Sequence, residues 1–214
     1  MTLPLPRDRA HVAPGAVHVP DWLSPERQTA LLAASREWAR PPAGMHQIEL
    51  REGRKMSIRT VCLGWRWEPY RFTRVAHDGH PVKPMPQWLA ELGREALADA
   101  YGRPELAASY APDIAVVNYY DREARLGMHQ DKEERSLAPV VSFSLGDTCT
   151  FRIGGTEHRN RPWTDVSLQS GDLFVFGGPS RMAFHAVPRT FPGTCPRHLD
   201  LVGRVNITLR MSGL

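Results

Sequence analysis

Two histidines and an aspartate are spaced as ligands of one metal ion. His129 and Asp131 are separated by a single residue, and on an extended chain residues i and i+2 point to the same side. His185 lies far downstream, in a run that predicts a separate strand. Two imidazoles and one carboxylate form a facial triad suited to iron(II), which leaves coordination positions open for a chelating cosubstrate and oxygen. A second His-x-Asp pair, His198 and Asp200, has no histidine after it to complete such a set.

The last predicted strand, residues 204–211, carries its polar side chains on one face. Residues of equal parity in a strand project to the same side, and Arg204, Asn206 and Arg210 share that parity. Two spaced guanidiniums can each bind one end of a dicarboxylate, whereas an exposed strand with outward arginines would need no ligand. Asn118 and Tyr120 also share parity, and either donate hydrogen bonds to the same anion or serve as ordinary sheet residues.

Basic and aromatic residues interleave between residues 51 and 83. The basic ones are Arg51, Arg54, Lys55, Arg59, Arg66, Arg71, Arg74 and Lys83, and the aromatic ones are Trp65, Trp67, Tyr70 and Phe72. Basic groups neutralise phosphates while aromatic faces stack on unpaired bases. A solvated basic face over ordinary core aromatics is the competing interpretation. The net charge of +4 and the pI of about 9.2 are by themselves only a weak indication of a polyanionic partner.

Positioning these residues requires a β-rich scaffold with helices packed on it. Ser24 as N-cap followed by Pro25 predicts a helix that runs to about residue 38, and a second helix covers about 86–101 before Gly102. Short β-rich runs then alternate with turn residues: 113–120, 140–145, 149–153, 165–168, 172–176, 182–187 and 204–211. The expected fold class is α+β, with two antiparallel sheets in a sandwich or jelly roll and helices buttressing one of them.

Length and composition fit one integrated domain. We expect an N-terminal extension and helix over residues 1–44, a lid over 45–85, and the second helix with the jelly-roll core over 86–214. The proline-rich first 20 residues are expected to run over the surface. No apolar run approaches the roughly 20 residues that span a bilayer, no secretory signal is evident, and the three cysteines lack CxxC spacing. These features favour a cytoplasmic monomer without a membrane or an obligate protein partner.

In order and spacing, the motifs resemble the AlkB family of nucleic-acid demethylases. The matching segments are Asn118-x-Tyr120, His129-Gln130-Asp131-Lys132, Ser142-Phe143-Ser144-Leu145-Gly146, Ser170-Gly171-Asp172, Gly177-Gly178-Pro179-Ser180-Arg181, His185 and Arg204-x-Asn206-x-x-x-Arg210. The resemblance covers about residues 55–211 and implies a double-stranded β-helix with a nucleotide-recognition lid. It also implies an iron(II)- and 2-oxoglutarate-dependent dioxygenase that uses O2 to demethylate N-alkylated bases, such as 1-methyladenine and 3-methylcytosine, in DNA or RNA. Formaldehyde and succinate would be released.

The resemblance further implies a role for each matching residue. Iron would be bound by His129, Asp131 and His185. The distal carboxylate of 2-oxoglutarate would be bound by Arg204, Asn118 and Tyr120, and its metal-chelating end would be fixed by Asn206 and Arg210. In the lid, Trp65 would stack on a flipped base and Tyr70 would hold the phosphate backbone. Arg159 and Arg181 are further candidates for substrate or structural contacts. Glu133 would face the base edge, where the best-known bacterial members carry Asp, so the resemblance leaves the base preference open.

Two other functions are compatible with the same residues. A 2-oxoglutarate oxygenase of this fold can act on tRNA, a protein side chain, a lipid or a small metabolite, because a fold does not determine a substrate. A non-enzymatic jelly-roll protein of cupin type that binds a small anion is the third hypothesis. The open coordination positions of the predicted triad argue against that last function.

Overall fold

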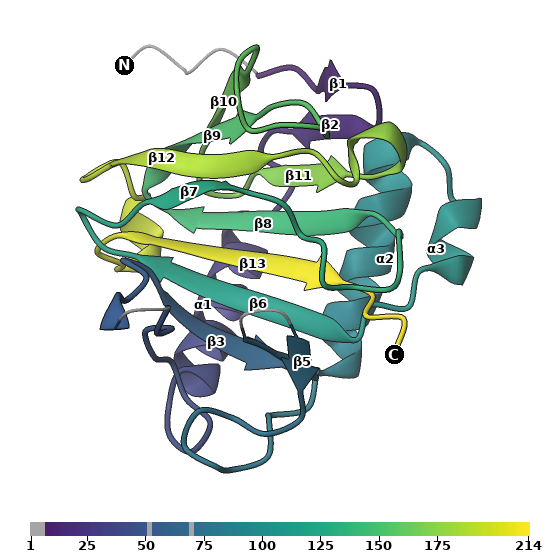
Figure 1. Ribbon diagram of the computed structural model, residues 1–214. Helices are drawn as coiled ribbons and strands as arrows, with labels where there is room; N and C mark the ends of the chain where they lie inside the picture. Colours follow the sequence, from purple (N-terminus) through teal and green to yellow (C-terminus); the bar gives the residue numbers. More distant parts are fainter. Residues whose placement is uncertain (1–6, 51–52, 69–70) are drawn as a thin grey trace.

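Two antiparallel sheets, packed face to face, form the centre of the molecule (Figure 1). The computed structural model describes residues 7–50, 53–68 and 71–214. The large sheet has the strand order β1-β2-β11-β8-β13-β6-β3, the small sheet has the order β10-β9-β12-β7, and β4 pairs with β5 alone. This arrangement is the jelly roll expected from the alternation of short β-rich runs and turns.

The elements have the following bounds. The strands are β1 Ala10–Ala13, β2 Ala16–Val19, β3 Arg59–Leu63, β4 Arg66–Glu68, β5 Arg71–Thr73, β6 Ile114–Tyr120, β7 Leu126–His129, β8 Val140–Gly146, β9 Thr148–Ile153, β10 Thr164–Leu168, β11 Leu173–Phe176, β12 His185–Phe191 and β13 Arg204–Arg210. The α-helices are α1 Pro25–Trp38, α2 Gln87–Tyr101 and α3 Glu105–Ser109, and two 3-10 turns cover Gly178–Ser180 and Arg197–Leu199. No helix in these described segments is long and apolar enough to cross a membrane.

Helices α1 and α2 cover the outer face of the large sheet and lie behind it in Figure 1. Helix α1 begins as predicted, with the Ser24 hydroxyl accepting a hydrogen bond from the Arg27 amide at 3.3 Å. Helix α2 ends at Gly102, whose φ of 63° is the left-handed conformation that glycine adopts at little cost. Trp88, near the start of α2, is 45% exposed and stacks on Trp38.

Side chains alternate between the two faces of each strand, so the large sheet contributes to two separate hydrophobic cores. On the outer face of the large sheet, Val205, Ile207 and Leu209 of β13 pack in one apolar cluster with the helices. Between the sheets, a second cluster contains Phe151 of β9 and Phe174 of β11. Because the side-chain period of a strand is two residues, the polar residues of β13 must face the space between the sheets.

The expectation that the first 20 residues run over the surface is wrong for the described part of this segment. Strands β1 and β2 form a hairpin, and β2 pairs with β11 along its full length, from Ala16 to Val19. Ala16 and Val17 are completely buried. Pro14 and Pro20 lie outside the strands, where their missing amide removes no ladder hydrogen bond. The residues on either side of the turn at Gly15 therefore determine the structure of this segment, and its proline content does not prevent the two strands from forming.

A buried carboxylate fastens this N-terminal segment to the sheet. Asp172 is fully buried and binds Arg7 through both oxygens, at 2.6 and 2.8 Å. Its Oδ2 also lies 2.8 Å from Nε2 of His18, and Oδ1 accepts the Asp21 amide. Burial opposes ionisation, but His18 and Arg7 outweigh it and lower the pKa of Asp172.

We expect Asp172→Asn to lower the free energy of unfolding by about 3 kcal/mol, because it removes the carboxylate from a buried ion-pair network and leaves its partners uncompensated. Thermal and urea unfolding measure this loss. The matched control is Asp165→Asn, which breaks the pair with Arg152 on the surface of the small sheet and should cost less than about 1 kcal/mol. Equal losses in the two variants would contradict the anchoring role of Asp172.

Candidate metal and cosubstrate site

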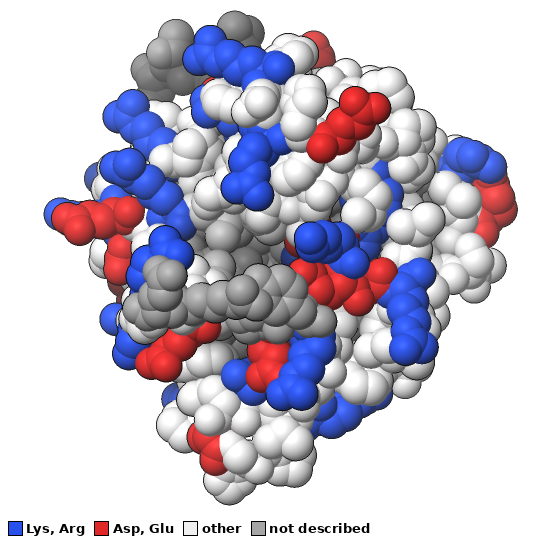
Figure 2. Space-filling model, viewed as in Figure 1, with Lys and Arg blue, Asp and Glu red and all other residues white. Residues whose placement is uncertain are grey.

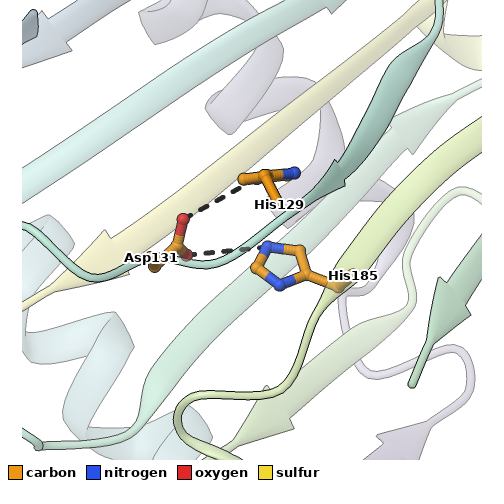
Figure 3. A group of neighbouring side chains, drawn as sticks. All are labelled: His129, Asp131 and His185. Atoms are coloured by element: carbon orange, nitrogen blue, oxygen red, sulfur yellow. Dashed lines mark ion pairs between the residues drawn. The ribbon is translucent and has the colours of Figure 1, made fainter. Parts of the chain in front are cut away.

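The three predicted metal ligands converge between the two sheets. Strands β7 and β12 are antiparallel neighbours in which His129 lies directly opposite His185. Asp131 lies two residues after the histidine that ends β7, and its side chain turns toward both rings (Figure 3). One ligand atom from each of the three residues lies within 4.8 Å of the others. This is the spacing of a single-ion site.

Hydrogen bonds to the backbone orient both imidazoles for metal binding. Nδ1 of His129 lies 2.8 Å from the carbonyl oxygen of Gly127, and Nδ1 of His185 lies 3.0 Å from that of Ala183. A carbonyl oxygen only accepts, so each Nδ1 must carry the proton and each Nε2 keeps a free lone pair. Each Nε2 lies 3.7 Å from a different oxygen of Asp131, which is too far for a hydrogen bond. The donor set therefore fits a divalent ion held between the three groups.

The charge states also suit metal binding. Burial, followed by the neighbouring His129 ring, lowers the pKa of His185 to about 4, so its imidazole is neutral at pH 7. Burial would raise the pKa of Asp131, but the Arg210 guanidinium and the two imidazoles together hold it down to about 2. The site thus offers an ionised carboxylate and at least one neutral imidazole without prior loss of a proton.

Gln130, which lies between His129 and Asp131 directly after β7, was not identified from the sequence. Its Nε2 donates to the carbonyl oxygens of Thr156, at 2.9 Å, and Met182, at 2.7 Å. These bonds connect the segment that carries His129 and Asp131 with the approach to His185. The side chain of a single intervening residue gives no sequence signal for such a role, because only the folded chain brings its two acceptors together.

Arg204 is a buried cation without a carboxylate partner among the described residues. It is 1% exposed, and its Nη2 donates to the Ser144 hydroxyl at 2.9 Å. A weaker contact joins Nη1 to the carbonyl oxygen of Asp147 at 3.4 Å, and Nε has no hydrogen-bond partner in the described chain. A buried guanidinium without a counter-ion is costly unless it binds an anion. This end of the site could therefore hold an anionic ligand.

The other residues predicted to bind the cosubstrate line the same inner pocket. Strand β13 pairs with β6 so that Arg204 lies beside Tyr120 and Asn206 beside Asn118. The pocket extends from Arg204 to the three candidate metal ligands and Arg210. The Asn206 amide is already bonded to β8, donating to the Ser142 hydroxyl and to the Phe143 carbonyl oxygen. Asn206 therefore lines the pocket with its amide nitrogen already bonded to β8.

Arg210 connects the site with a buried acid that sequence reasoning missed. Its Nη2 lies 2.9 Å from Oδ2 of Asp131, and its Nη1 donates to Glu134 at 2.9 Å. Oδ2 of Asp131 nonetheless lacks a hydrogen bond of good geometry within the described residues, so this ion pair is an electrostatic contact that leaves its lone pairs accessible.

Arg181 does not reach the substrate side of the site. It is 2% exposed and does not line the outer cavity. Its guanidinium donates to the main-chain oxygens of Asp131 and Ala138 and to Glu134. Of the two roles expected for Arg181, substrate contact or structural contact, its placement favours the structural one.

An outer cavity of about 650 Å³ opens above the candidate metal ligands. Its lining contains Glu133 and Arg159, as expected, together with Met56, Trp67 and Met128. Five Lys and Arg residues line it: Lys55, Arg125, Lys132, Arg159 and, at its inner end, Arg210. Figure 2 shows this face hollowed in the middle, with Lys and Arg side chains around the hollow and over the small sheet. A cavity of this size admits a nucleobase.

The tryptophan that lines the cavity, together with Phe184, is Trp67, whereas Trp65 was expected there. The Trp65 indole donates to Asp113 at 3.1 Å, and the Arg74 guanidinium covers its ring at 3.7 Å. Trp65 does not line the cavity. The two tryptophans share strand parity, so their spacing could not distinguish them. Tyr70, predicted to hold the phosphate backbone, lies outside the described residues.

Comparisons with known proteins agree with this geometry. Residues 15–210 match the family model of the 2OG-Fe(II) oxygenase superfamily. The chain is 37% identical to an alpha-ketoglutarate-dependent dioxygenase AlkB homolog of Caulobacter vibrioides, over 93% of this chain and 88% of the relative. It is 34% identical to the DNA N(6)-methyladenine demethylase ALKBH1D of Arabidopsis thaliana, over 93% of this chain and 50% of the relative. The chain thus spans about half the length of its Arabidopsis relatives.

A solved structure shares the whole fold. The structure of OsALKBH1 superimposes with a TM-score of 0.85 at 31% sequence identity, covering 95% of this chain and all of that chain. The similarity includes the N-terminal segment, for which the motifs gave the weakest resemblance.

Proposed function

Because the chain belongs to the 2OG-Fe(II) oxygenase superfamily and to the AlkB-type proteins within it, we propose that it oxidatively demethylates N-alkylated bases of DNA or RNA. The observation that carries this proposal is a His-His-Asp cluster beside a buried guanidinium that has no carboxylate partner in the described chain. The two features match the two components of one cofactor set, a divalent metal and a dicarboxylate. The metal is iron(II), the dicarboxylate is 2-oxoglutarate, and O2 is the oxidant.

The chain's own residues would bind and orient these groups. His129, Asp131 and His185 would hold iron(II), and Arg204 would bind the far carboxylate of 2-oxoglutarate. When bound, iron(II) and 2-oxoglutarate supply the oxidation of an N-methyl group by O2, with release of formaldehyde, succinate and carbon dioxide. The apolar residues of the inter-sheet core, among them Phe151 and Phe176, line the inner pocket and exclude water from it.

The outer cavity would take the alkylated base. Trp67 offers an aromatic face for stacking, and Glu133 offers an acceptor for the base edge or its positive charge. The basic residues of the rim would bind the phosphates on either side. A base whose pairing is blocked by a methyl group costs less to extract from its stack, which favours damaged over intact bases.

A turnover screen tests the proposed function. The protein, loaded anaerobically with iron(II), is mixed with 2-oxoglutarate, air and oligonucleotides that carry 1-methyladenine, 3-methylcytosine or N6-methyladenine, as DNA and as RNA including a tRNA. We expect formaldehyde in equal amount to the methyl groups lost. Consumption of 2-oxoglutarate without loss of methyl from any oligonucleotide would instead support an oxygenase with a non-nucleic-acid substrate. The expected monomeric state and cytoplasmic location are checked separately, by light scattering and cell fractionation.

Trp67→Ala should raise the KM for a methylated oligonucleotide about tenfold, because stacking of a base on an aromatic ring contributes about 1–3 kcal/mol. Steady-state formaldehyde release at saturating 2-oxoglutarate measures this effect. Trp65→Ala is the matched control, since its ring contacts Asp113 and Arg74 away from the cavity. A larger KM effect from Trp65→Ala than from Trp67→Ala would refute the assignment of Trp67.

A further inference from the structure

Glu134 is buried behind the candidate metal ligands and has no place in the function proposed above. It is 8% exposed, does not line the outer cavity and is not within the inner pocket. Its two oxygens have different partners, with Arg210 Nη1 at 2.9 Å from Oε1 and Arg181 Nη2 at 3.3 Å from Oε2. Of the two guanidiniums that contact Glu134, that of Arg210 also contacts the carboxylate of Asp131, and that of Arg181 donates to the main-chain oxygen of Asp131.

Through Arg210, Glu134 is in electrostatic contact with the candidate metal ligand. Each terminal nitrogen of Arg210 contacts a different carboxylate, Nη1 that of Glu134 and Nη2 that of Asp131. A guanidinium paired in bidentate fashion with one carboxylate neutralises it most effectively. Here Glu134 occupies one arm of the guanidinium, so Asp131 receives only the other arm. Asp131 therefore keeps more of its negative charge for a cation.

Other buried guanidiniums near Asp131 increase the effect of Glu134 on metal binding. Arg181 also donates to the main-chain oxygen of Asp131, at 2.8 Å, and Arg204 lines the same inner pocket. Without Glu134, Asp131 would be the one carboxylate left beside the buried guanidiniums of Arg181 and Arg210 in the described chain. Repulsion between such an excess of positive charge and a divalent cation is strong at the low effective dielectric of a buried site.

We propose that Glu134 is a positioning residue that occupies Arg210 and balances the local charge, so that Asp131 remains available to bind a divalent metal ion. The inference rests on the proposed function, because it assumes that Asp131 is a metal ligand. It assigns Glu134 a task distinct from that of its neighbour Glu133, which faces the outer cavity.

Binding of manganese(II) to the metal-free protein tests the role of Glu134 without any turnover. The free manganese signal in electron paramagnetic resonance gives the dissociation constant directly. We expect Glu134→Gln to weaken binding about tenfold or more, because the buried charge is lost while the amide keeps similar volume and one hydrogen-bond acceptor. Glu134→Asp, which retains the charge, should recover most of the affinity. The exposed Glu123→Gln is the matched control and should bind manganese as the wild type does.

A purely structural role would give a different pattern. In that case Glu134→Gln would lower the melting temperature while its manganese affinity stayed within about twofold of wild type, which would overturn the proposal. The same substitution in an Arg181→Gln background, where one charge of each sign is removed, provides a second comparison if the single variant does not fold. There too, loss of Glu134 should weaken manganese binding relative to Arg181→Gln alone, and equal affinities would overturn the proposal.

The outcome for Glu134 is separable from the outcome for the proposed function. If the wild type binds manganese but demethylates no oligonucleotide, the substrate assignment fails while the role of Glu134 stands or falls on the affinities. If demethylation occurs and Glu134→Gln binds manganese as tightly as wild type, the role of Glu134 alone is wrong.

Discussion

Replacement of Arg204 by methionine is expected to raise the KM for 2-oxoglutarate about 100-fold or more. Removing one partner of a buried ion pair costs about 2–5 kcal/mol of binding, and Arg204 is the fully buried cation of the inner pocket. The dependence of succinate formation on 2-oxoglutarate concentration measures the effect. Manganese affinity should change little, because the Arg204 guanidinium bonds to Ser144 and Asp147 and not to the candidate metal ligands.

The same variant has a second, less obvious consequence for stability. In the ligand-free protein, Arg204→Met removes a buried charge that has no carboxylate partner in the described chain, so the free energy of unfolding should stay unchanged or increase. Saturating 2-oxoglutarate should then stabilise the wild type but not the variant. Arg152→Met, on the surface of the small sheet, is the control and should leave the KM unchanged. A KM for Arg204→Met within threefold of wild type would remove the basis for placing the dicarboxylate there.

His185→Ala should reduce demethylation by about 10³-fold or more, because the charge stabilisation that a bound metal supplies is worth several kcal/mol. The rate of formaldehyde release at saturating iron(II) and 2-oxoglutarate is the measurement. The chain contains its own control in His198, the histidine of the second His-x-Asp pair, which is exposed within the 3-10 turn Arg197–Leu199. His198→Ala should retain wild-type activity, and a comparable loss in both variants would show that the effect does not come from the metal site.

The candidate site was predictable from the sequence where a short-range pattern determines the side to which a side chain points. Parity along residues 204–210 placed the polar face of β13 toward the inter-sheet pocket and its apolar face toward the helices. The i, i+2 spacing put His129 and Asp131 on the same side, although Asp131 follows the end of β7 and is not itself in a strand. Capping residues likewise predicted the beginning of α1 at Ser24 and the end of α2 at Gly102, since these signals depend only on neighbouring residues.

Features that depend on pairing between distant segments were not predictable in this way. Strands β1 and β2 owe their existence to β11, which is about 150 residues later in the chain. Trp65 and Trp67 share one parity, so their spacing does not show which of them lines the cavity. Only the position of β3 and β4 relative to the cavity places Trp67 there. Glu134 and Arg181 form a buried ion pair. Charged residues in a sequence normally indicate a solvent-exposed surface, so this buried pair could not be predicted.

A crystal structure of the protein with manganese(II) and 2-oxoglutarate under anaerobic conditions would test the central claim most directly. We predict one manganese ion bound by His129, Asp131 and His185, with the far carboxylate of 2-oxoglutarate paired to Arg204. A metal bound elsewhere, or an Arg204 guanidinium that stays without an anionic partner while 2-oxoglutarate binds at another place, would contradict the account.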